Sequence, residues 1–356
     1  MKKPKISKIV PKRLKRRSKV EERASEALAD VPRITNETVA EHREEVLSSA
    51  RKYIYPLQHS KRRVVAVSLS LLGAAIIIFL VYCGLALYKF QSTSGFIYDV
   101  TRVIPFPVAK AGPSWISYES YLFELRRNMH YYETQQKVNF GDASGKRALR
   151  RYKAQALQRV TDDAFVKRLA AQHQVSVSSQ EVDTEVALLK QQNRLGSNNQ
   201  VFETVLSEFW GWDVNDFKRE LSQQLLAQRV VAKLDTVTQA RAKLALAQLQ
   251  GGADFATLAG QASDDTATKG SGGQYTSLIS RSDRDIPPQV SSELFKLKPG
   301  QTSGIIDTGY TLEIIQLLDM QGSKAHAAHI QFNFQSINSY IGPLEAKQRP
   351  HDFIKV

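Results

Sequence analysis

The uncharged run VVAVSLSLLGAAIIIFLVYCGLALY (residues 64–88) divides the chain into a basic leader and a much longer remainder. Its 25 residues directly follow Lys61-Arg62-Arg63 and include no charged side chain. At about 1.5 Å per residue, a helix of this length can cross a bilayer core of roughly 30 Å while satisfying its own backbone hydrogen bonds. We therefore expect a single transmembrane helix at 64–88, with a tail before it and folded domains after it.

Three other interpretations of this run are weaker. A cleaved signal peptide has a shorter apolar core and lies at the very N-terminus, whereas this run follows a leader of 63 residues. A lipoprotein signal ending at Cys83 would, by resemblance to such families, need a small residue before the cysteine, whereas Tyr82 is bulky. A helix buried in a globular core is usually amphipathic rather than apolar all round. Because Cys83 is the single cysteine of the chain, no internal disulfide can form.

The charge of +14 is concentrated before the apolar run. Residues 1–63 hold 18 Lys and Arg against 8 Asp and Glu, a net charge of +10, which leaves +4 for the rest of the chain. Loops flanking a span are richer in Lys and Arg on the cytoplasmic side, so we expect a cytoplasmic N-terminus and extracytoplasmic C-terminal domains in a single-pass cell-membrane protein. The basic cluster at 12–17 has no interleaved aromatics, which favours a largely disordered tail touching anionic lipid over a nucleic-acid site.

Residues 100–235 read as a helical domain. The run 103–113 contains three prolines and is expected to be an extended linker. Apolar residues then recur at helical spacing in several segments, and two polar pairs indicate helix starts. Ser178 with Glu181 fits a capping box, and Asp213 is placed to cap the next helix. Neither metal-ligand spacing nor a nucleophile motif is present in this region.

Three segments of this region carry a resemblance. Residues 149–157, residues 170–182 and residues 210–217 together are similar to the N-terminal chaperone domain of SurA-like foldases. The resemblance implies a helical chaperone domain over 100–235. With its predicted membrane anchor, the chain also resembles the membrane-anchored foldases of the PrsA and PpiD type.

A second resemblance follows from five ordered elements between 255 and 318. They are Phe255-Ala-Thr-Leu-Ala259, Ser263-Asp264-Asp265, Gly272-Gly273, Leu297-Lys-Pro-Gly300-Gln-Thr-Ser303, and the strand-like run after Gly309-Tyr310. In this order they resemble parvulin-type peptidyl-prolyl cis-trans isomerases. The resemblance implies an α+β domain over 236–335, with a four-stranded antiparallel sheet and helices, followed by a C-terminal tail at 336–356.

The family's first strand, which carries a histidine, has no counterpart before Thr236. A similar segment, residues 326–334 with His329, instead follows the last strand of the pattern. The first and last strands of the family are antiparallel neighbours, and a short loop suffices to join such strands. We therefore hypothesise a circularly permuted sheet. A second, truncated isomerase domain is the rival, but only 27 residues follow His329.

The parvulin resemblance implies a set of site residues. The catalytic candidates are Asp265, His329, Thr308 and Thr311, and the substrate-binding candidates are Ile286, Val290 and Phe295. Thr311 falls where the family's Gly-Tyr-His-Ile-Ile pattern has its second histidine. Each of these residues also has an ordinary structural interpretation: a turn-capping aspartate, a core histidine, or apolar packing.

The function implied is that of a membrane-anchored extracytoplasmic foldase acting on unfolded or translocating polypeptides with X-Pro bonds. Rotation about an X-Pro bond needs no covalent step, only tighter binding of the twisted amide than of either planar form. Neither a cofactor nor a metal is implied, and a nucleic acid is not an expected partner. The alternative is an inactive holdase or membrane-assembly scaffold that uses a parvulin fold to bind peptides, which the replacement at Thr311 favours.

Overall fold

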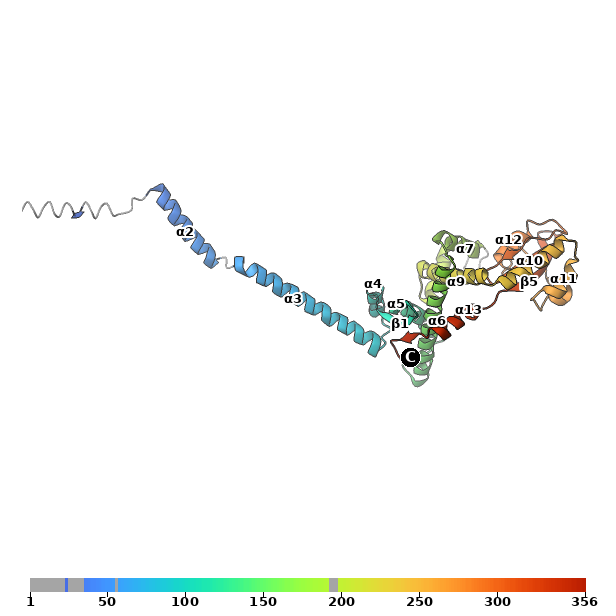
Figure 1. The fold of residues 1–356 in the computed structure, drawn as a ribbon, viewed down its shortest axis with the longest axis horizontal. Coiled ribbons are helices and arrows are strands. Elements are labelled where there is room, and N and C mark those ends of the chain that lie inside the picture. Colours follow the sequence, from blue (N-terminus) through green and yellow to red (C-terminus); the bar gives the residue numbers. More distant parts are fainter. Residues whose placement is uncertain (1–22, 25–34, 55–56, 192–197) are drawn as a thin grey trace, which may run out of the picture. The chain divides into compact units, whose positions relative to one another are not determined.

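The computed structural model describes residues 23–24, 35–54, 57–191 and 198–356. The chain divides into two units, residues 1–81 and 82–356, which are described separately (Figure 1). The basic cluster predicted to orient the protein, residues 12–17, lies outside the described residues.

The first unit is helical wherever it is described. Helix α2 (Asn36–Ile54) lies within the segment predicted to be largely disordered, and α3 (Leu57–Gly84) contains most of the uncharged run. Among the described residues one helix is long and apolar enough to cross a membrane, Arg63–Lys89, with a mean hydropathy of 2.9. The helical form of the predicted span is confirmed.

The second unit begins with a helical lobe. After α3 come a π-helical turn, η1 (Leu85–Lys89), and then α4 (Gly95–Val103), β1 (Pro107–Ala111), β2 (Ser114–Ser117), α5 (Tyr118–Thr134), α6 (Ala143–Gln172), α7 (Ser179–Gln191), α8 (Asn199–Trp210) and α9 (Val214–Leu234). Both predicted caps form. Ser178 and Glu181 hydrogen-bond reciprocally, and Asp213 makes a capping box with Asp216.

The predicted linker at 103–113 is in fact part of a small sheet. Strand β1 pairs with β2 through a tight turn at Gly112, whose φ of 59° suits glycine. It also pairs with β6 (His351–Asp352), so the sheet has the order β2-β1-β6. The domain predicted to be all-helical therefore contains a sheet, whose third strand comes from the other end of the chain and leaves no local sequence signal.

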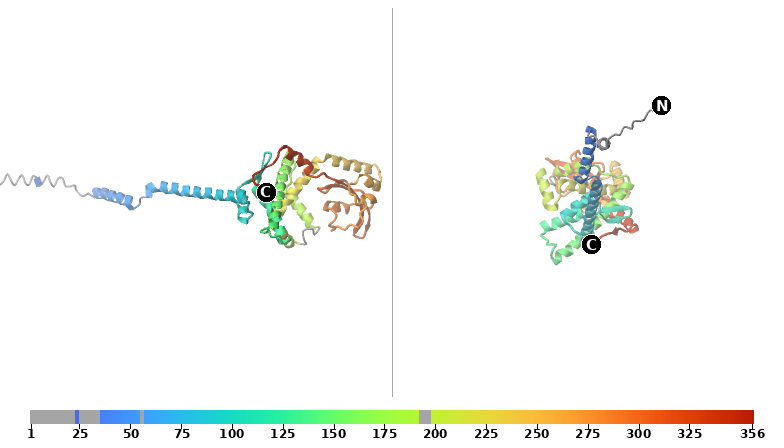
Figure 2. Two further views of the ribbon diagram at one scale, coloured as in Figure 1. Left: turned by 90° about the horizontal axis from the view of Figure 1, so that it is seen from below. Right: turned by 90° about the vertical axis from the view of Figure 1, so that its left-hand side faces the viewer.

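The C-terminal segment, predicted to be a tail, returns to this lobe. Helix α13 (Asn338–Lys347) contacts α6, and the segment in red lies against the green helices in Figure 2. Ile341 is 2% exposed and Ile354 4% exposed, and both join the core formed by α5, α6 and β1. The core of the lobe thus includes residues that precede the isomerase-like domain in the sequence and residues that follow it.

The isomerase-like domain is built on one antiparallel sheet. Its elements are α10 (Thr236–Gln250), α11 (Phe255–Ala262), η2 (Lys269–Ser271), α12 (Pro288–Leu294), β3 (Ile306–Asp307), β4 (Thr311–Gln321) and β5 (Lys324–Asn333). Strand β5 pairs with β4 along its whole length, which confirms the pairing predicted for residues 326–334. The sheet order is β3-β4-β5, and the predicted fourth strand is reduced to isolated bridges at Gln274 and Ile279 along the free edge of β5.

Alternate side chains along β4 and β5 point into two different cores, one on each face of the sheet. This alternation decides on which face the site residues lie. Side chains of successive residues point to opposite faces of a sheet. Ile314 and Ile330 face α10 and α11, whereas Ile315 and Leu317 pack with α12. His329 is paired with Ile315 and therefore lies on the α12 face. The α+β class expected from the sequence is confirmed.

Candidate functional site

The loop that carries Asp265 is fixed to strand β5. The Ser263 hydroxyl accepts hydrogen bonds from the backbone N–H groups of Asp265 and Gln331, at 3.3 and 3.1 Å. The backbone N–H of Asp264 donates to the Gln331 carbonyl at 2.7 Å. Since Gln331 is two residues from His329 on the same strand, these bonds set the position of Asp265 relative to the imidazole.

A glycine allows the next segment to approach β5 just as closely. Gly273 has a φ of 80°, and a Cβ built on it would collide with the carbonyl oxygen of His329. The backbone N–H of His329 donates to the Gly273 carbonyl at 2.8 Å. The glycine pair of the sequence pattern therefore has a steric reason, because the chain here lies directly on the strand that carries the histidine.

His329 lies between two carboxylates. Its Nε2 is 2.9 Å from Asp265 Oδ2, and its Nδ1 is 3.1 Å from Glu313 Oε2. Thr268 Oγ1 lies 3.0 Å from the same Nε2 and donates to Asp265 at 2.5 Å. The His329 side chain is 5% exposed and that of Glu313 4%. Glu313 reaches the ring because it stands on the same sheet face as Ile315, the partner of His329 across the strands.

The electrostatics of this group favour a charged imidazole. Burial by itself lowers the pKa of His329, but the hydrogen bonds and charges of Glu313 and Asp265 outweigh it, and the net pKa is raised. Partial burial raises the pKa of Asp265, yet bonds from Thr268, the Ala267 N–H and His329 outweigh this and lower it. The arrangement thus favours the charged form of an imidazole that lies between two carboxylates and is itself only 5% exposed.

Two threonines extend the network along the surface of the sheet. Thr311 Oγ1 donates to Glu313 Oε1 at 3.1 Å and lies 2.7 Å from Thr308 Oγ1. The structure therefore joins four predicted catalytic residues, Asp265, His329, Thr308 and Thr311, in one chain of contacts. The link that completes this chain is Glu313, which the sequence analysis did not single out.

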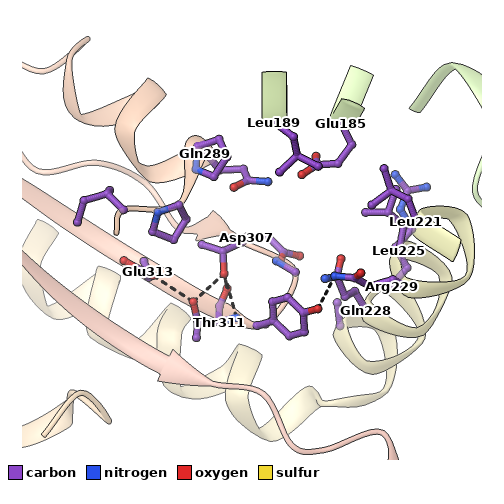
Figure 3. Close-up of a pocket in the computed structure, with 18 of the residues that line it drawn as sticks. Glu185, Leu189, Leu221, Leu225, Gln228, Arg229, Gln289, Asp307, Thr311 and Glu313 are labelled. Carbon is purple, nitrogen blue, oxygen red and sulfur yellow. Dashed lines mark hydrogen bonds between the residues drawn. The ribbon is translucent and has the colours of Figure 1, made fainter. Parts of the chain in front are cut away.

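A groove of about 1070 Å³ opens above this network, between the helical lobe and the isomerase-like domain. His329, Glu313 and the ring of Tyr275 line its floor. The opposite wall includes Leu221 and Leu225 of α9 and Leu189 of α7 (Figure 3). One end is bridged by a 2.5 Å hydrogen bond from Gln224 Nε2 to the Tyr310 hydroxyl. Polar side chains, among them Glu185 and Gln228, line the same wall as the leucines, and this mixed lining suits an extended segment of another chain.

The three predicted substrate-binding residues lie in two different places. Ile286 lines the groove, together with Pro287 and Pro288. Val290 is fully buried in the core between α12 and the sheet, and Phe295 packs against that core with Arg281 4.4 Å above its ring. Asp265 contacts the imidazole from the side away from the groove lining. In this structure Val290 and Phe295 are packing residues, and Asp265 positions His329.

Glu313, Thr268 and Tyr275 are the site residues that sequence reasoning missed. The parvulin pattern was aligned on Gly309-Tyr310, which places its histidine at Thr311. Aligned instead on Ile314-Ile315, the same pattern places it at Glu313. A carboxylate inside an otherwise apolar strand was a second available signal, because buried charges are normally paired.

The tyrosine completes the surroundings of the imidazole. The Tyr275 ring lies 4.4 Å from that of His329, inclined by 31°, and burial raises the pKa of its hydroxyl. The described part of the chain contains no cluster of three side chains able to hold a metal ion.

Comparisons with known proteins match two family models to successive parts of the chain. The model of the PPIC-type peptidyl-prolyl isomerase domain, the rotamase, matches residues 226–319, and the model of the SurA-like N-terminal domain matches residues 57–231. The chain joins a SurA-like domain to a parvulin-type domain. It is of the isomerase and foldase-chaperone class. The parvulin match ends at residue 319, before β5, so the strand that carries His329 lies outside the matched segment.

The searches beyond the family models add little. No curated protein matches. Among solved structures, the foldase PrsA of Streptococcus pneumoniae str. Canada MDR_19A is 18% identical, with 68% of this chain and 85% of that chain covered and a TM-score of 0.22. The foldase PrsA of Lactococcus lactis is 15% identical, with 68% and 84% covered and a TM-score of 0.24. TM-scores this low do not establish a shared arrangement of the domains.

Proposed function

We propose that this SurA-like and parvulin-type protein is a membrane-anchored foldase that catalyses cis-trans isomerisation of X-Pro bonds in extracytoplasmic polypeptides. The observation that carries the proposal is the imidazole of His329, held between Asp265 and Glu313 at the floor of a groove whose opposite wall includes leucines. An isomerase must bind the twisted amide more tightly than the planar forms. Fixed charges in a site with little water can supply that difference, because they need no reorganisation during rotation.

Each residue of the site has a separate role in this proposal. Ile286 and Tyr275 offer apolar surface to a proline ring. His329 and Glu313 present the polar floor to the rotating amide, and Thr308 with Thr311 continues that floor toward the preceding part of the client. Asp265 fixes the imidazole from behind. The leucines of α9 would hold a neighbouring apolar stretch of the client.

A refolding assay tests the enzyme claim. The slow phase of a protein whose refolding is limited by prolyl isomerisation takes tens of seconds and should shorten in the presence of the full chain in detergent micelles. His329→Gln should abolish at least about nine-tenths of the acceleration, since removing one preorganised hydrogen-bond donor from an active site typically costs about 10²–10³-fold in rate. The matched control is His326→Gln, on the same strand but paired only at 3.6 Å with Asp319, and it should retain the acceleration. Equal rates with and without protein would remove the enzyme claim.

A holdase is the second candidate, because a carboxylate at 313 stands where the realigned pattern has a histidine and Val290 lies in the core. A holdase would suppress aggregation of an unfolded client without shortening its slow phase, and His329→Gln would leave that suppression unchanged. Leu225→Asp would abolish it, because Leu225 is only partly buried and the change places a charge on the wall of the groove.

The anchor and the orientation are part of the same proposal. They are supported by the uncharged helix over Arg63–Lys89 and by the net charge of +10 before it. Protease added to intact cells should cleave the region beyond residue 100 and spare residues 1–63. Protection of the C-terminal domains with loss of the leader would reverse the orientation.

A further inference from the structure

The last turns of the uncharged run belong to the folded lobe. Cys83 and Leu87 are fully buried and Ala86 is 6% exposed. Ala86 and Leu87 share a core with Ile97 of α4, and the Leu87 carbonyl accepts a 2.6 Å hydrogen bond from the Tyr118 hydroxyl. The sequence predicted a span as far as residue 88. In the structure, only the part before Cys83 is free of such packing.

The remaining length still suffices for a membrane. Residues 64–82 form 19 helical positions, or about 28 Å at 1.5 Å per residue, close to the roughly 30 Å of a bilayer core. Tyr82 and Leu85, which lie beside the buried positions, are 55% and 48% exposed. Ala86 and Leu87, which follow this stretch within a few residues, are part of the core of the lobe.

Helix α4 carries a second apolar surface at this place. Its Ile97 and Thr101 are 2% and 3% exposed and face the core. Phe96 is 57% exposed and Val103 83% exposed, and seven residues apart they lie on one stripe of the helix. The exposed charged residue Arg102 is turned from Val103 by about 100°. This helix thus has a side in the core and an exposed apolar stripe, and charged residues flank the stripe, with Asp99 about 40° from Val103.

The turn between η1 and α4 has the same character. Phe90 is 70% exposed, and Lys89 beside it is exposed as well. An apolar stripe flanked by charged side chains is typical of helices that lie in the headgroup region of a bilayer. Lysine at the end of a span also suits this region, because its aliphatic stem can lie along the lipid while its ammonium group stays in water.

We propose that α4 and the Phe90 turn lie in the surface of the bilayer, with the stripe of Phe96 and Val103 among the lipid chains. This inference rests on the proposed membrane anchor and adds a second lipid contact to it. The occupant is lipid because the stripe belongs to a helix whose core side packs against the continuation of the span itself, through Leu87 and Ile97. Held this way, the lobe sits on the membrane surface with one fixed face toward it.

Site-directed fluorescence in vesicles tests this position of α4 in the bilayer surface, called the seat of α4 below. Full-length protein in which Cys83 is changed to Ala is given a single cysteine by Phe96→Cys, Val103→Cys or Arg102→Cys, labelled with the dye NBD and reconstituted in vesicles of phosphatidylcholine and phosphatidylglycerol. The apolar face of an interfacial helix lies about 5–10 Å into the headgroup and acyl boundary, so nitroxide lipids should quench the dye at 96 and 103 at least about twofold more than at 102. Iodide in the water should show the opposite order.

Arg102→Cys is the matched control, since it adds the dye to the same helix one residue away. Should Cys83→Ala disturb the lobe, the wild-type Cys83 can be kept, because its full burial shields it from labelling. Equal lipid quenching at the three positions would overturn the inference, and so would protection at 96 and 103 from both quenchers, which indicates a second copy or another protein. Protein that fails to float with the vesicles would overturn the anchor and this seat together, whereas floating protein without lipid quenching overturns the seat alone.

Discussion

Replacing Glu313 by Gln should separate the charge of this residue from its shape. The amide oxygen of Gln can still accept a hydrogen bond from His329 Nδ1, so the change removes mainly the negative charge 3.1 Å from the ring. A hydrogen bond to a charged group contributes about 1.5–3 kcal/mol, and a neutral one about 1 kcal/mol. The difference is about 0.5–2 kcal/mol, and its loss should lower the pKa of His329.

The pH dependence fixes the sign of this effect. The folded-state pKa of His329 is raised above that of an unfolded histidine, about 6.5. Its charged form therefore stabilises the fold fully below about pH 6.5, and this stabilisation is lost as the pH rises through the folded-state pKa. Glu313→Gln should lower the free energy of unfolding by about 0.5–2 kcal/mol near pH 6 and by clearly less at pH 9.5, where the imidazole is more often neutral.

NMR titration of the histidine Cε1 protons measures the pKa directly in the full chain in micelles, with His329 assigned by its loss in His329→Gln. Asp319→Asn is the control: it removes a carboxylate 3.6 Å from the more exposed His326 and should leave the His329 titration unchanged. Urea unfolding at the two pH values supplies the free energies. A pKa of His329 that stays the same or rises in Glu313→Gln, or an equal loss of stability at both pH values, would refute the reasoning.

Three further changes test other parts of the structure. Ile341→Ala should lower the free energy of unfolding by about 2–4 kcal/mol, because its side chain is 2% exposed, and a loss below about 0.5 kcal/mol would mean that the C-terminal segment is a loose tail after all. Gly273→Ala should destabilise the isomerase-like domain and shift the His329 resonances, since the added Cβ meets a backbone carbonyl; unchanged spectra would contradict the packing. Burial raises the pKa of Glu124 to about 7, so the helical lobe should gain stability as the pH falls from 8 to 5, and Glu124→Gln, compared by urea unfolding, should flatten that dependence; an unaltered slope would count against it.

Sequence patterns predicted those parts of the fold that depend on interactions between residues close together in the sequence. The uncharged run predicted a helix, and the Ser178 and Asp213 caps formed, because each depends on residues within one helical turn. The pairing of β5 with β4 also followed from nearby sequence, since only two residues, Gly322 and Ser323, join the two strands in a hairpin. Strand β1 was missed because its partner β6 lies some 240 residues away, and its prolines indicate an extended chain without saying what pairs with it.

The candidate site was predicted in part for a similar reason. The resemblance located Asp265 and His329, which the fold brings within 2.9 Å. Glu313 was missed because the pattern was placed two residues too early, and residues two apart on a strand lie on the same face, so both Thr311 and Glu313 enter the network. Burial cannot be read from a short apolar helix, and Val290 is in the core although it is adjacent in sequence to residues that line the groove.

The most direct test of the account is exchange NMR on a short peptide with one X-Pro bond, mixed with the full-length protein in micelles. The exchange cross-peaks between cis and trans proline report catalysed rotation itself, without a folding client. The account predicts cross-peaks with the wild-type protein and with His326→Gln, and their loss with His329→Gln and Glu313→Gln. Cross-peaks that persist in His329→Gln, or that are absent from the wild-type mixture, would contradict the claim that the imidazole between two carboxylates is the isomerisation site.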